Sequence, residues 1–156
     1  MAWLTFNVGR RKMNTADFSS IEESLRLRVP EWYRAALEVY PFPKEEPELF
    51  GNAQEVINQN QEYRKTGWFG FSWPATFFII GEDGCGNLYF IDLGVSDRRV
   101  FIADHDGGPE PKKETLEEMV SSPSLEAHIK ETFENQKGIE AMAIARGTKK
   151  WWQFWR

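Results

Sequence analysis

The side chains best suited to acid–base or metal chemistry surround one histidine, in the run Asp104-His105-Asp106. Two carboxylates beside an imidazole could ligate a metal ion or act as general acid and base. In a strand, however, Asp104 and Asp106 point to one face and His105 to the other, so the three side chains do not converge on one ion. We therefore expect no metal site. We expect Asp106 to start a turn with the two glycines that follow, because Asp side chains bond backbone N–H groups there.

Asp104 and Asp106 belong to a larger set of carboxylates, which lie where the apolar segments in the middle of the chain end. They are Glu82, Asp83, Asp92, Asp97, Asp104 and Asp106. Paired carboxylates hydrolyse glycosidic bonds when held at the right separation, so a hydrolase that uses Asp92, Asp104 or His105 is one alternative. Turns are commonly acidic for conformational reasons, and an acidic rim that faces a basic partner requires no tuned pKa values, so we expect no catalytic residue. Of these carboxylates, we expect four to bind a partner: Glu82, Asp83, Asp92 and Asp97.

The segment 81–87 combines three glycines with the one cysteine of the chain, Cys85. One cysteine excludes an internal disulfide and a multi-cysteine metal site, and no imidazole signature accompanies it. The glycine spacing differs from that of phosphate-binding loops, because neither Lys-Ser/Thr nor a helix follows. We expect no cofactor here. Gly81, Gly84 and Gly86 are able to take positive φ, so the chain can reverse here between two strands.

Three apolar runs rich in Phe, Ile, Tyr and Val, at 76–80, 88–93 and 100–103, predict consecutive strands around these turns. The middle run is apolar on both faces, which predicts a central strand that is covered on both sides. Helical spacing of apolar residues precedes and follows the three runs. The predicted fold is therefore α+β: a single domain over residues 1–156, with a mixed or antiparallel β-sheet, helices packed against it, and a core over 18–135.

Capping signals place the expected helices. Overlapping Ser-x-x-Glu patterns at 19–23 predict a short first helix, and Pro30 starts a second that carries Tyr33 on its apolar face. A third helix is expected from a cap at Asn52 to a glycine stop at Gly67. After the sheet, helical stripes are expected at Leu116, Met119 and Val120, and, behind a cap at Ser124, at Leu125, Ile129 and Phe133.

The run 68–73, WFGFSW, crowds four aromatic side chains around a glycine. Such residues more often fill a core than bind a partner, but we expect at least one to stay partly exposed. Exposed aromatic residues are common interface anchors, so Trp68, Phe69 and Trp73 join the predicted partner-binding set. The C-terminal tail 147–156 is also rich in tryptophan. The alternatives for this tail are packing on its own domain or on a second copy as a homodimer, then partner binding, then membrane contact.

Composition limits the classes of function. The 156 residues carry a net charge of −5 and are 41% hydrophobic, enough for one core but without the clustered Lys and Arg that direct nucleic-acid binding requires. No run approaches the roughly 18 apolar residues of a membrane span. The basic triplet 10–12 follows the apolar stretch 2–8 instead of preceding it, so we expect no signal peptide and a cytoplasmic protein.

The hairpin and the strands after it resemble the core motif of the SUKH superfamily of Smi/Knr-like proteins. The matching residues are Ile80, Gly81, Asp83, Gly84, Cys85, Gly86 and Asn87, then Asp92, then Val100, His105 and Asp106. Upstream, Pro30, Tyr33 and Leu37 match a Pro-x-x-Tyr helix start that members carry, whereas 40–43 departs from the Asn-Gly-Gly turn that often follows. The resemblance covers most of the chain, and the expected helices and strands follow one another in the same order as in the superfamily.

The resemblance implies a binding module without catalytic residues. Many bacterial members are immunity proteins that neutralise a toxin delivered by neighbouring cells, so the implied partner is a basic toxin domain, covered sterically. Eukaryotic relatives imply a second alternative, a regulatory scaffold in cell-wall or signalling pathways. In the immunity hypothesis, an acidic surface with exposed aromatic side chains covers the basic cleft of the toxin.

Overall fold

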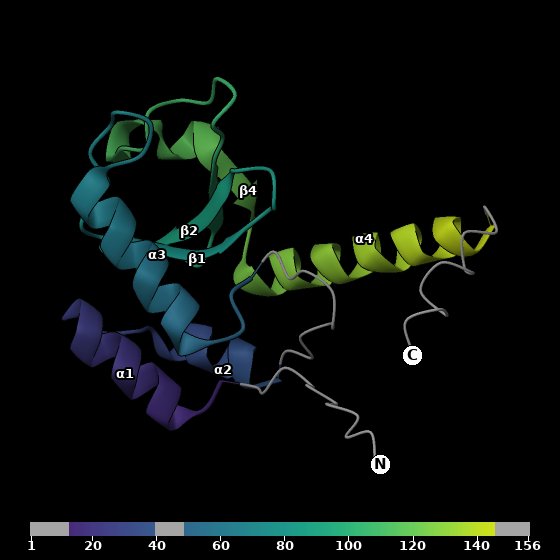
Figure 1. Ribbon diagram of the computed structural model, residues 1–156, viewed down its shortest axis with the longest axis horizontal. Coiled ribbons are helices and arrows are strands. Elements are labelled where there is room, and N and C mark those ends of the chain that lie inside the picture. The colour runs from purple at the N-terminus through teal and green to yellow at the C-terminus, as the bar shows by residue number, and fades with distance from the viewer. Residues whose placement is uncertain (1–12, 40–48, 146–156) are drawn as a thin grey trace, which may run out of the picture.

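The described part of the chain combines helices with a small antiparallel sheet (Figure 1). The computed structural model describes residues 13–39 and 49–145, so the predictions for 2–8 and 147–156 fall outside the described residues. The elements are α1 (Thr15–Leu25), α2 (Glu31–Val39), α3 (Ala53–Thr66), β1 (Phe77–Glu82), β2 (Leu88–Asp92), β3 (Val100–Ala103), the 3₁₀ helix η1 (Lys113–Met119), β4 (Val120–Ser122) and α4 (Leu125–Ala145). The predicted α+β class is confirmed.

The sheet is an antiparallel meander with the strand order β1-β2-β3-β4. The three predicted strands are confirmed with nearly the predicted bounds. In the pairing register, Ile91 of β2 lies opposite Phe78 of β1, and Phe90 lies opposite Phe101 of β3. Every residue of β2 is buried, which confirms that this strand is central and covered on both faces.

The fourth strand corrects the prediction of a helical stripe that included Val120. Helix η1 ends at Met119, and Val120 takes an extended backbone (φ −63°, ψ 115°) opposite Phe101 of β3. Leu116 and Val120 are four residues apart, which fits a helix, but a β-branched side chain suits a strand equally well. Pairing with β3 decides between the two, and no spacing in the sequence reports that pairing.

Helix α1 begins one turn earlier than the Ser-x-x-Glu patterns predict. Its N-cap is Asn14, whose Oδ1 accepts the N–H groups of Ala16 and Asp17, while Asp17 Oδ2 accepts the N–H of Asn14 at 2.8 Å. This reciprocal capping box satisfies N–H groups that a helix start leaves free. Ser19 lies inside the helix and donates its hydroxyl to Thr15 O, so the predicted cap at Ser19 is wrong.

The caps predicted for the later helices are confirmed. Asn52 Oδ1 accepts a backbone N–H at the start of α3, and Gly67 ends that helix with a φ of 73°. Ser124 Oγ accepts a backbone N–H at the start of α4. Figure 1 shows α4 running out past the sheet, and the helix continues to Ala145, beyond the predicted stripe that ends at Phe133.

The predicted structural motif Pro30-x-x-Tyr33 starts α2. Pro30 O accepts the N–H groups of Tyr33 and Arg34, both at 3.1 Å. Tyr33 is fully buried, and burial raises the pKa of its hydroxyl. Its ring meets Phe18 of α1 edge-on at 6.4 Å and Phe78 of β1 edge-on at 5.6 Å. One side chain therefore ties two helices to one face of the sheet.

The opposite face of the sheet carries a column of aromatic rings. Phe90 stacks on Phe77 at 4.7 Å and on Phe101 at 5.4 Å between ring centroids. Trp73 lies edge-on to Phe90 at 5.3 Å, and its Nε1 donates to Phe77 O at 3.2 Å. Each fully buried ring of this kind stabilises the fold by about 1.5–3 kcal/mol. The middle of the sheet is thus fixed by packing, and its two ends are formed by turns.

Asn60 closes the outer edge of β1. The side chain accepts the N–H of Ile79 at 2.9 Å and donates to Ile79 O at 2.8 Å, and it also donates to Val56 O within α3. Phe50 N–H donates to Ile80 O one residue further along the strand. Asn60 is a polar residue within the apolar stripe of α3. Its side chain forms hydrogen bonds with backbone groups of β1 that an edge strand would otherwise leave without partners.

Candidate functional site

The predicted partner-binding residues divide between the two ends of the sheet. Strand β2 runs from Leu88, opposite Ala103, to Asp92, opposite Phe77, so the turn that precedes β2 and the turn that follows it lie at opposite ends. The hairpin end, as we name it, is the surface formed by Phe69, Glu82, Asp83, Asn87, His105 and Asp106. The pocket end is the surface formed by Asp92, Asp97 and the residues that line a hollow beside them.

The crowded aromatic run splits into buried and exposed members, as expected. Trp68 and Trp73 are only 2% and 6% exposed, whereas Phe69 is 67% and Phe71 is 41% exposed. A buried side chain presents no surface to a partner in this conformation, so the predicted partner-binding set is revised. Trp68 and Trp73 belong to the core, and Phe69 is the accessible member.

Asp83 organises the hairpin turn. One carboxylate oxygen accepts the N–H of Cys85 at 2.8 Å and that of Asn87 at 3.1 Å, and the other accepts the side-chain N–H of Asn87 at 2.7 Å. Partial burial raises the pKa of Asp83, but these hydrogen bonds to the charged form outweigh it and hold the pKa below its ordinary value. Gly84 and Gly86 take φ values of 75° and 107°, as predicted.

Gly81 does not share this role. It is buried inside β1, and the pairing register with β2 shifts between Ile79 and Gly81. The glycines with positive φ in this hairpin are Gly84 and Gly86, so the reversal uses two of the three glycines that could have taken this conformation. A glycine inside a strand commonly marks an irregularity of the ladder, and Gly81 occupies such a position.

Asn87 connects the turn to His105. Asn87 Oδ1 accepts the backbone N–H of His105 at 3.0 Å and lies 2.8 Å from the ring Nδ1. Because the amide nitrogen of Asn87 donates to Asp83, its oxygen is the acceptor, and Nδ1–H of His105 is the donor. The other ring nitrogen, Nε2, lies 3.2 Å from Oδ1 of Asp106. The side chains from Asp83 to Asp106 therefore hold the imidazole in one orientation.

Asp104, and not Asp106, forms the turn after β3. Asp104 Oδ1 accepts the N–H of Asp106 at 2.8 Å, and Asp104 O accepts the N–H of Gly108 at 3.2 Å. A Cβ on Gly108 would lie 2.9 Å from Asp104, which explains a glycine at this position. The prediction that Asp106 starts the turn is wrong. The side chain of Asp106 is instead 83% exposed beside the ring of His105.

Phe69 stands on the ring of His105. The two rings stack with centroids 6.0 Å apart and an interplanar angle of 28°, and Trp68 meets Phe69 edge-on at 5.1 Å. Phe69 and Gly70 form a two-residue turn, closed by reciprocal backbone hydrogen bonds between Trp68 and Phe71. Both turn residues have positive φ, 46° and 87°, a conformation that favours Asn, Asp and Gly and costs a phenylalanine roughly 1 kcal/mol.

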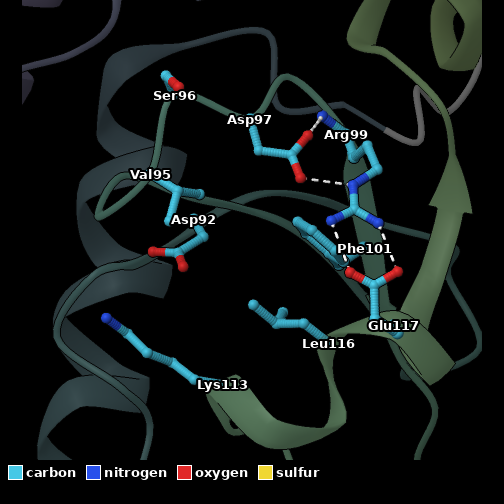
Figure 2. Close-up of a pocket in the computed structure, with 9 residues that line it drawn as sticks. All are labelled: Asp92, Val95, Ser96, Asp97, Arg99, Phe101, Lys113, Leu116 and Glu117. Atoms are coloured by element: carbon cyan, nitrogen blue, oxygen red, sulfur yellow. Dashed lines mark hydrogen bonds and ion pairs between the residues drawn. The ribbon is translucent and has the colours of Figure 1, made fainter.

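The pocket end is a hollow of about 420 Å³ (Figure 2). Its walls come from the end of β2, the following turn, β3 and η1, through Asp92, Val95, Ser96, Asp97, Arg99, Phe101, Lys113, Leu116 and Glu117. Arg99 lies between two carboxylates: its Nη1 and Nη2 donate to Glu117 at 2.9 Å each, and its Nε donates to Asp97. Glu117 first and Asp97 second raise the pKa of Arg99, so this cation is paired.

Asp92 belongs to this hollow although the residue is only 2% exposed. Its Oδ1 accepts the N–H of Gly94 at 2.8 Å. The sequence identified Asp92 and Asp97 but missed Arg99 and Glu117 as members of the same site. Arg99 and Glu117 are 18 residues apart on different elements, and no periodicity joins them.

The structure does not bring together the residues of the hydrolase alternative. Asp92 lies at the pocket end, whereas Asp104 and His105 lie at the hairpin end. Within residues 13–39 and 49–145, no group of three or more His, Cys, Asp or Glu side chains is arranged to hold a metal ion. In the same part of the chain, no helix has both the length and the apolar character that crossing a membrane requires.

These features define the class of protein: an α+β domain in which helices cover an antiparallel meander and the candidate binding residues lie on the turns at its ends. The model of the SMI1/KNR4 family (SUKH-1) matches residues 12–122, more than half of the chain. The chain belongs to this family, which confirms the resemblance and is consistent with an immunity-type, protein-binding role. The matched region ends in β4, and α4 lies beyond it. No curated protein matches the chain.

Proposed function

We propose that this protein is a non-catalytic binding module of the immunity type, which neutralises a toxin domain by covering it. Membership of the SMI1/KNR4 family supports the class. The observation that carries the proposal is Phe69, whose ring is 67% exposed in a backbone conformation unfavourable for phenylalanine. A conformational cost at a ring that stays mostly exposed supports an interaction outside the chain, in addition to the contacts with His105 and Trp68.

The charge around Phe69 indicates the chemistry of the partner. The segments 67–71, 81–87 and 103–108 contain no Lys or Arg. Glu82 and Asp106 are exposed there, and the net charge of the chain is −5. An acidic rim around an aromatic anchor complements a basic cleft. The charges speed the encounter, and the ring, once buried against the partner, slows dissociation. The proposed partner is therefore a basic toxin domain.

The proposed site of action is the cytoplasm, where the immunity protein meets a toxin that has entered the cell. The one cysteine, Cys85, is an exposed free thiol in the hairpin turn, which suits a reducing compartment. A regulatory scaffold of cell-wall or signalling pathways would use the same exposed surface. The identity of the bound partner separates the two roles.

The test is co-expression with candidate toxins, followed by affinity measurements on Phe69→Ala. Removal of an anchor ring is expected to weaken binding at least about 10-fold. Val120→Ala is the matched control, because Val120 is also an exposed apolar side chain (38%) but lies on β4. Val120→Ala is expected to leave the affinity unchanged. An affinity that stays the same in Phe69→Ala, or that does not fall as the salt concentration rises, would contradict docking on an acidic hairpin end.

A further inference from the structure

His105 and Asp106 present two acceptor atoms to each other at the hairpin end. Nδ1 of His105 donates its proton to Asn87, so Nε2 of the neutral imidazole carries a lone pair. This nitrogen lies 3.2 Å from Oδ1 of Asp106, and an ionised carboxylate oxygen also only accepts. Two acceptors at hydrogen-bonding distance need a donor between them. The donor is either a proton on Nε2 or a group that comes from outside the chain.

The pair is open to a group from outside. The edge of the imidazole that carries Nδ1 faces the hairpin turn, where Asn87 accepts its proton and a Cβ on Gly86 would lie 3.4 Å away. The side chain of Asp106 is 83% exposed, and that of His105 is 24% exposed. The ring of Phe69 stacks on the imidazole and is itself mostly exposed. An accessible apolar surface therefore borders the two acceptors.

The charges around His105 favour a positively charged donor. Asp106 lies at Nε2, and Asp104, the residue before His105, forms the turn. Asp83 is hydrogen-bonded to the side chain of Asn87 on the other edge of the ring. The segments that form this surface contain no Lys or Arg. A cationic donor is therefore favoured over a neutral one such as water.

The spacing of the two acceptors selects arginine over lysine. The N–H bonds of an ammonium group diverge from one nitrogen at the tetrahedral angle, so acceptors 3.2 Å apart are too close for two straight hydrogen bonds. A guanidinium group carries parallel N–H donors on separate nitrogens, and acceptors at this spacing match them. The aliphatic stem of arginine also suits the exposed ring of Phe69.

We propose that Nε2 of His105 and Oδ1 of Asp106 form a subsite for one arginine side chain of the basic partner. The guanidinium donates one N–H to each acceptor, and the stem lies against Phe69. The inference rests on the proposed function, because it assigns a contact of the partner at the same hairpin end.

This subsite couples docking to pH. A protonated His105 donates from Nε2 to Asp106 and carries a positive charge, so it fills the place of the arginine and repels it. The arginine therefore binds the neutral imidazole, and a protonated one must first release its proton to the solvent. The sign follows directly: the affinity for a basic partner is highest where His105 is neutral and falls as the pH falls.

The first test uses a small probe and needs no toxin. The probe is arginine with its α-amino and carboxyl groups blocked as amides, titrated into the ¹⁵N-labelled protein at about pH 8 and followed by NMR. Blocked citrulline, which has the same length but an uncharged urea group, is the matched control. The arginine probe is expected to shift the backbone signals of Phe69 and Asp106 in a saturable way, and the citrulline probe is not. Equal shifts from both probes would overturn the proposal.

The pH dependence is a readout that an acidic surface alone does not produce. The affinity for the arginine probe is expected to fall several-fold between about pH 8 and about pH 5.5, a range over which histidines take up a proton. His128 stays neutral in the folded protein over this range, because burial lowers its pKa to about 4. Spectra of the imidazole nitrogens follow the protonation of His105, and saturating probe is expected to move it to lower pH. A constant affinity, or a protonation that the probe does not move, would overturn the proposal.

Three variants locate the two acceptors. His105→Asn keeps an amide donor for Asn87 but removes Nε2, so the remaining probe binding is expected to be weak and independent of pH. Asp106→Asn removes the charge and is expected to weaken binding several-fold at about pH 8. Glu23→Gln, at an exposed carboxylate of α1, is the matched control and is expected to bind as the wild type does. A pH dependence that persists in His105→Asn, or equal losses in Asp106→Asn and Glu23→Gln, would overturn the assignment. A spectrum with native dispersion shows that each variant is folded.

A toxin that binds the protein distinguishes this inference from the proposed function. If Phe69→Ala weakens toxin binding but the wild-type affinity is the same at both ends of this pH range, the subsite is wrong and the proposed function stands. If the arginine probe binds with the expected pH dependence but no toxin depends on Phe69, the proposed function fails and the subsite stands as a guanidinium site. We expect toxin binding to weaken in Phe69→Ala and in Asp106→Asn, and to lose its pH dependence in His105→Asn.

Discussion

The two ends of the sheet use the same residue type in different ways. At the hairpin end, Asp83 accepts three hydrogen bonds from its own turn, and the surface presents an aromatic ring, Phe69. At the pocket end, Asp92 accepts one such bond and keeps an oxygen without a described partner, while Phe101 is buried in the wall. Both carboxylates hold a turn, but the one at the hairpin end is fully hydrogen-bonded and the one at the pocket end only half so. What a partner can use depends on which groups the fold leaves both unsatisfied and exposed.

The difference follows from how each turn is built. Gly84 and Gly86 bring no side chains to the hairpin turn, so Asp83 supplies the acceptor that its N–H groups need. After β2, the ion pairs of Arg99 with Asp97 and Glu117 join the segment before β3 to η1. Asp92 adds to them only the hydrogen bond that its Oδ1 accepts from Gly94 N–H.

The largest expected effect comes from His128, which belongs to neither end. Burial lowers its pKa to about 4, against a smaller opposing effect of Glu131, and its ring packs on Tyr89 of β2. Between about pH 6.5 and 4 the unfolded chain binds a proton that the folded chain does not, so stability is full above about pH 6.5 and falls as the pH falls. The loss approaches about 3 kcal/mol near pH 4.

Urea unfolding at pH 7, 6 and 5 measures this dependence. His128→Gln, which cannot take up the proton, is expected to flatten the curve. An unchanged slope in the variant would assign the effect to other groups. Variants of the two ends are therefore best compared at pH 7, where the folded state is not losing stability through His128.

The next largest expected effect is a difference in the free energy of unfolding between variants of Asp83 and of Asp92. Asp83→Ala leaves three donors without their acceptor and is expected to lower the free energy of unfolding by about 2 kcal/mol, since each such bond contributes roughly 1 kcal/mol and the site is partly exposed. Asp92→Asn retains the bond to Gly94 and removes a buried charge, so it is expected to change stability by less than about 1 kcal/mol. Urea unfolding at pH 7 provides both values. Equal losses would contradict the contrast between a fully bonded and a half-bonded carboxylate.

The smallest expected effect is the most informative about Phe69. Asn tolerates the positive φ of this position, so Phe69→Asn is expected to leave the free energy of unfolding within about 0.5 kcal/mol of the wild type, despite the lost stacking on His105. The same variant is expected to lose toxin affinity. Phe71→Asn, at a second exposed phenylalanine, serves as the control. A large loss of stability in Phe69→Asn would show that the ring serves the fold and not a partner.

The fold could be predicted because local signals agreed with tertiary structure. The apolar strands flanked by glycines, the cap at Asn52 and the Pro30-x-x-Tyr33 start each depend on residues close in sequence. Strand β4 was missed because Val120 fits a helix and a strand equally, and pairing with β3 decided the outcome. The role of Asn60 could not be predicted, because its partner, Ile79, lies 19 residues away along the chain.

The candidate site could be predicted only in part. The aromatic run predicted that a ring would be exposed, but burial selected Phe69 and placed Trp68 and Trp73 in the core, which depends on how the turn of Phe69 and Gly70 is oriented. Asp92 was identified by its position after a strand. The hollow beside it is lined by the end of β2, the following turn, β3 and η1, so no single segment of the sequence predicts it.

The most direct test of the central claim is an amide hydrogen-exchange footprint of the protein bound to a toxin that it neutralises. Docking on the hairpin end predicts slower exchange over 67–71 and 83–87, and an occupied arginine subsite adds slower exchange over 103–108. Helices α1 and α2 serve as the internal reference and are expected to exchange as in the free protein. Slower exchange confined to those helices, with 67–71 unchanged, would contradict the account.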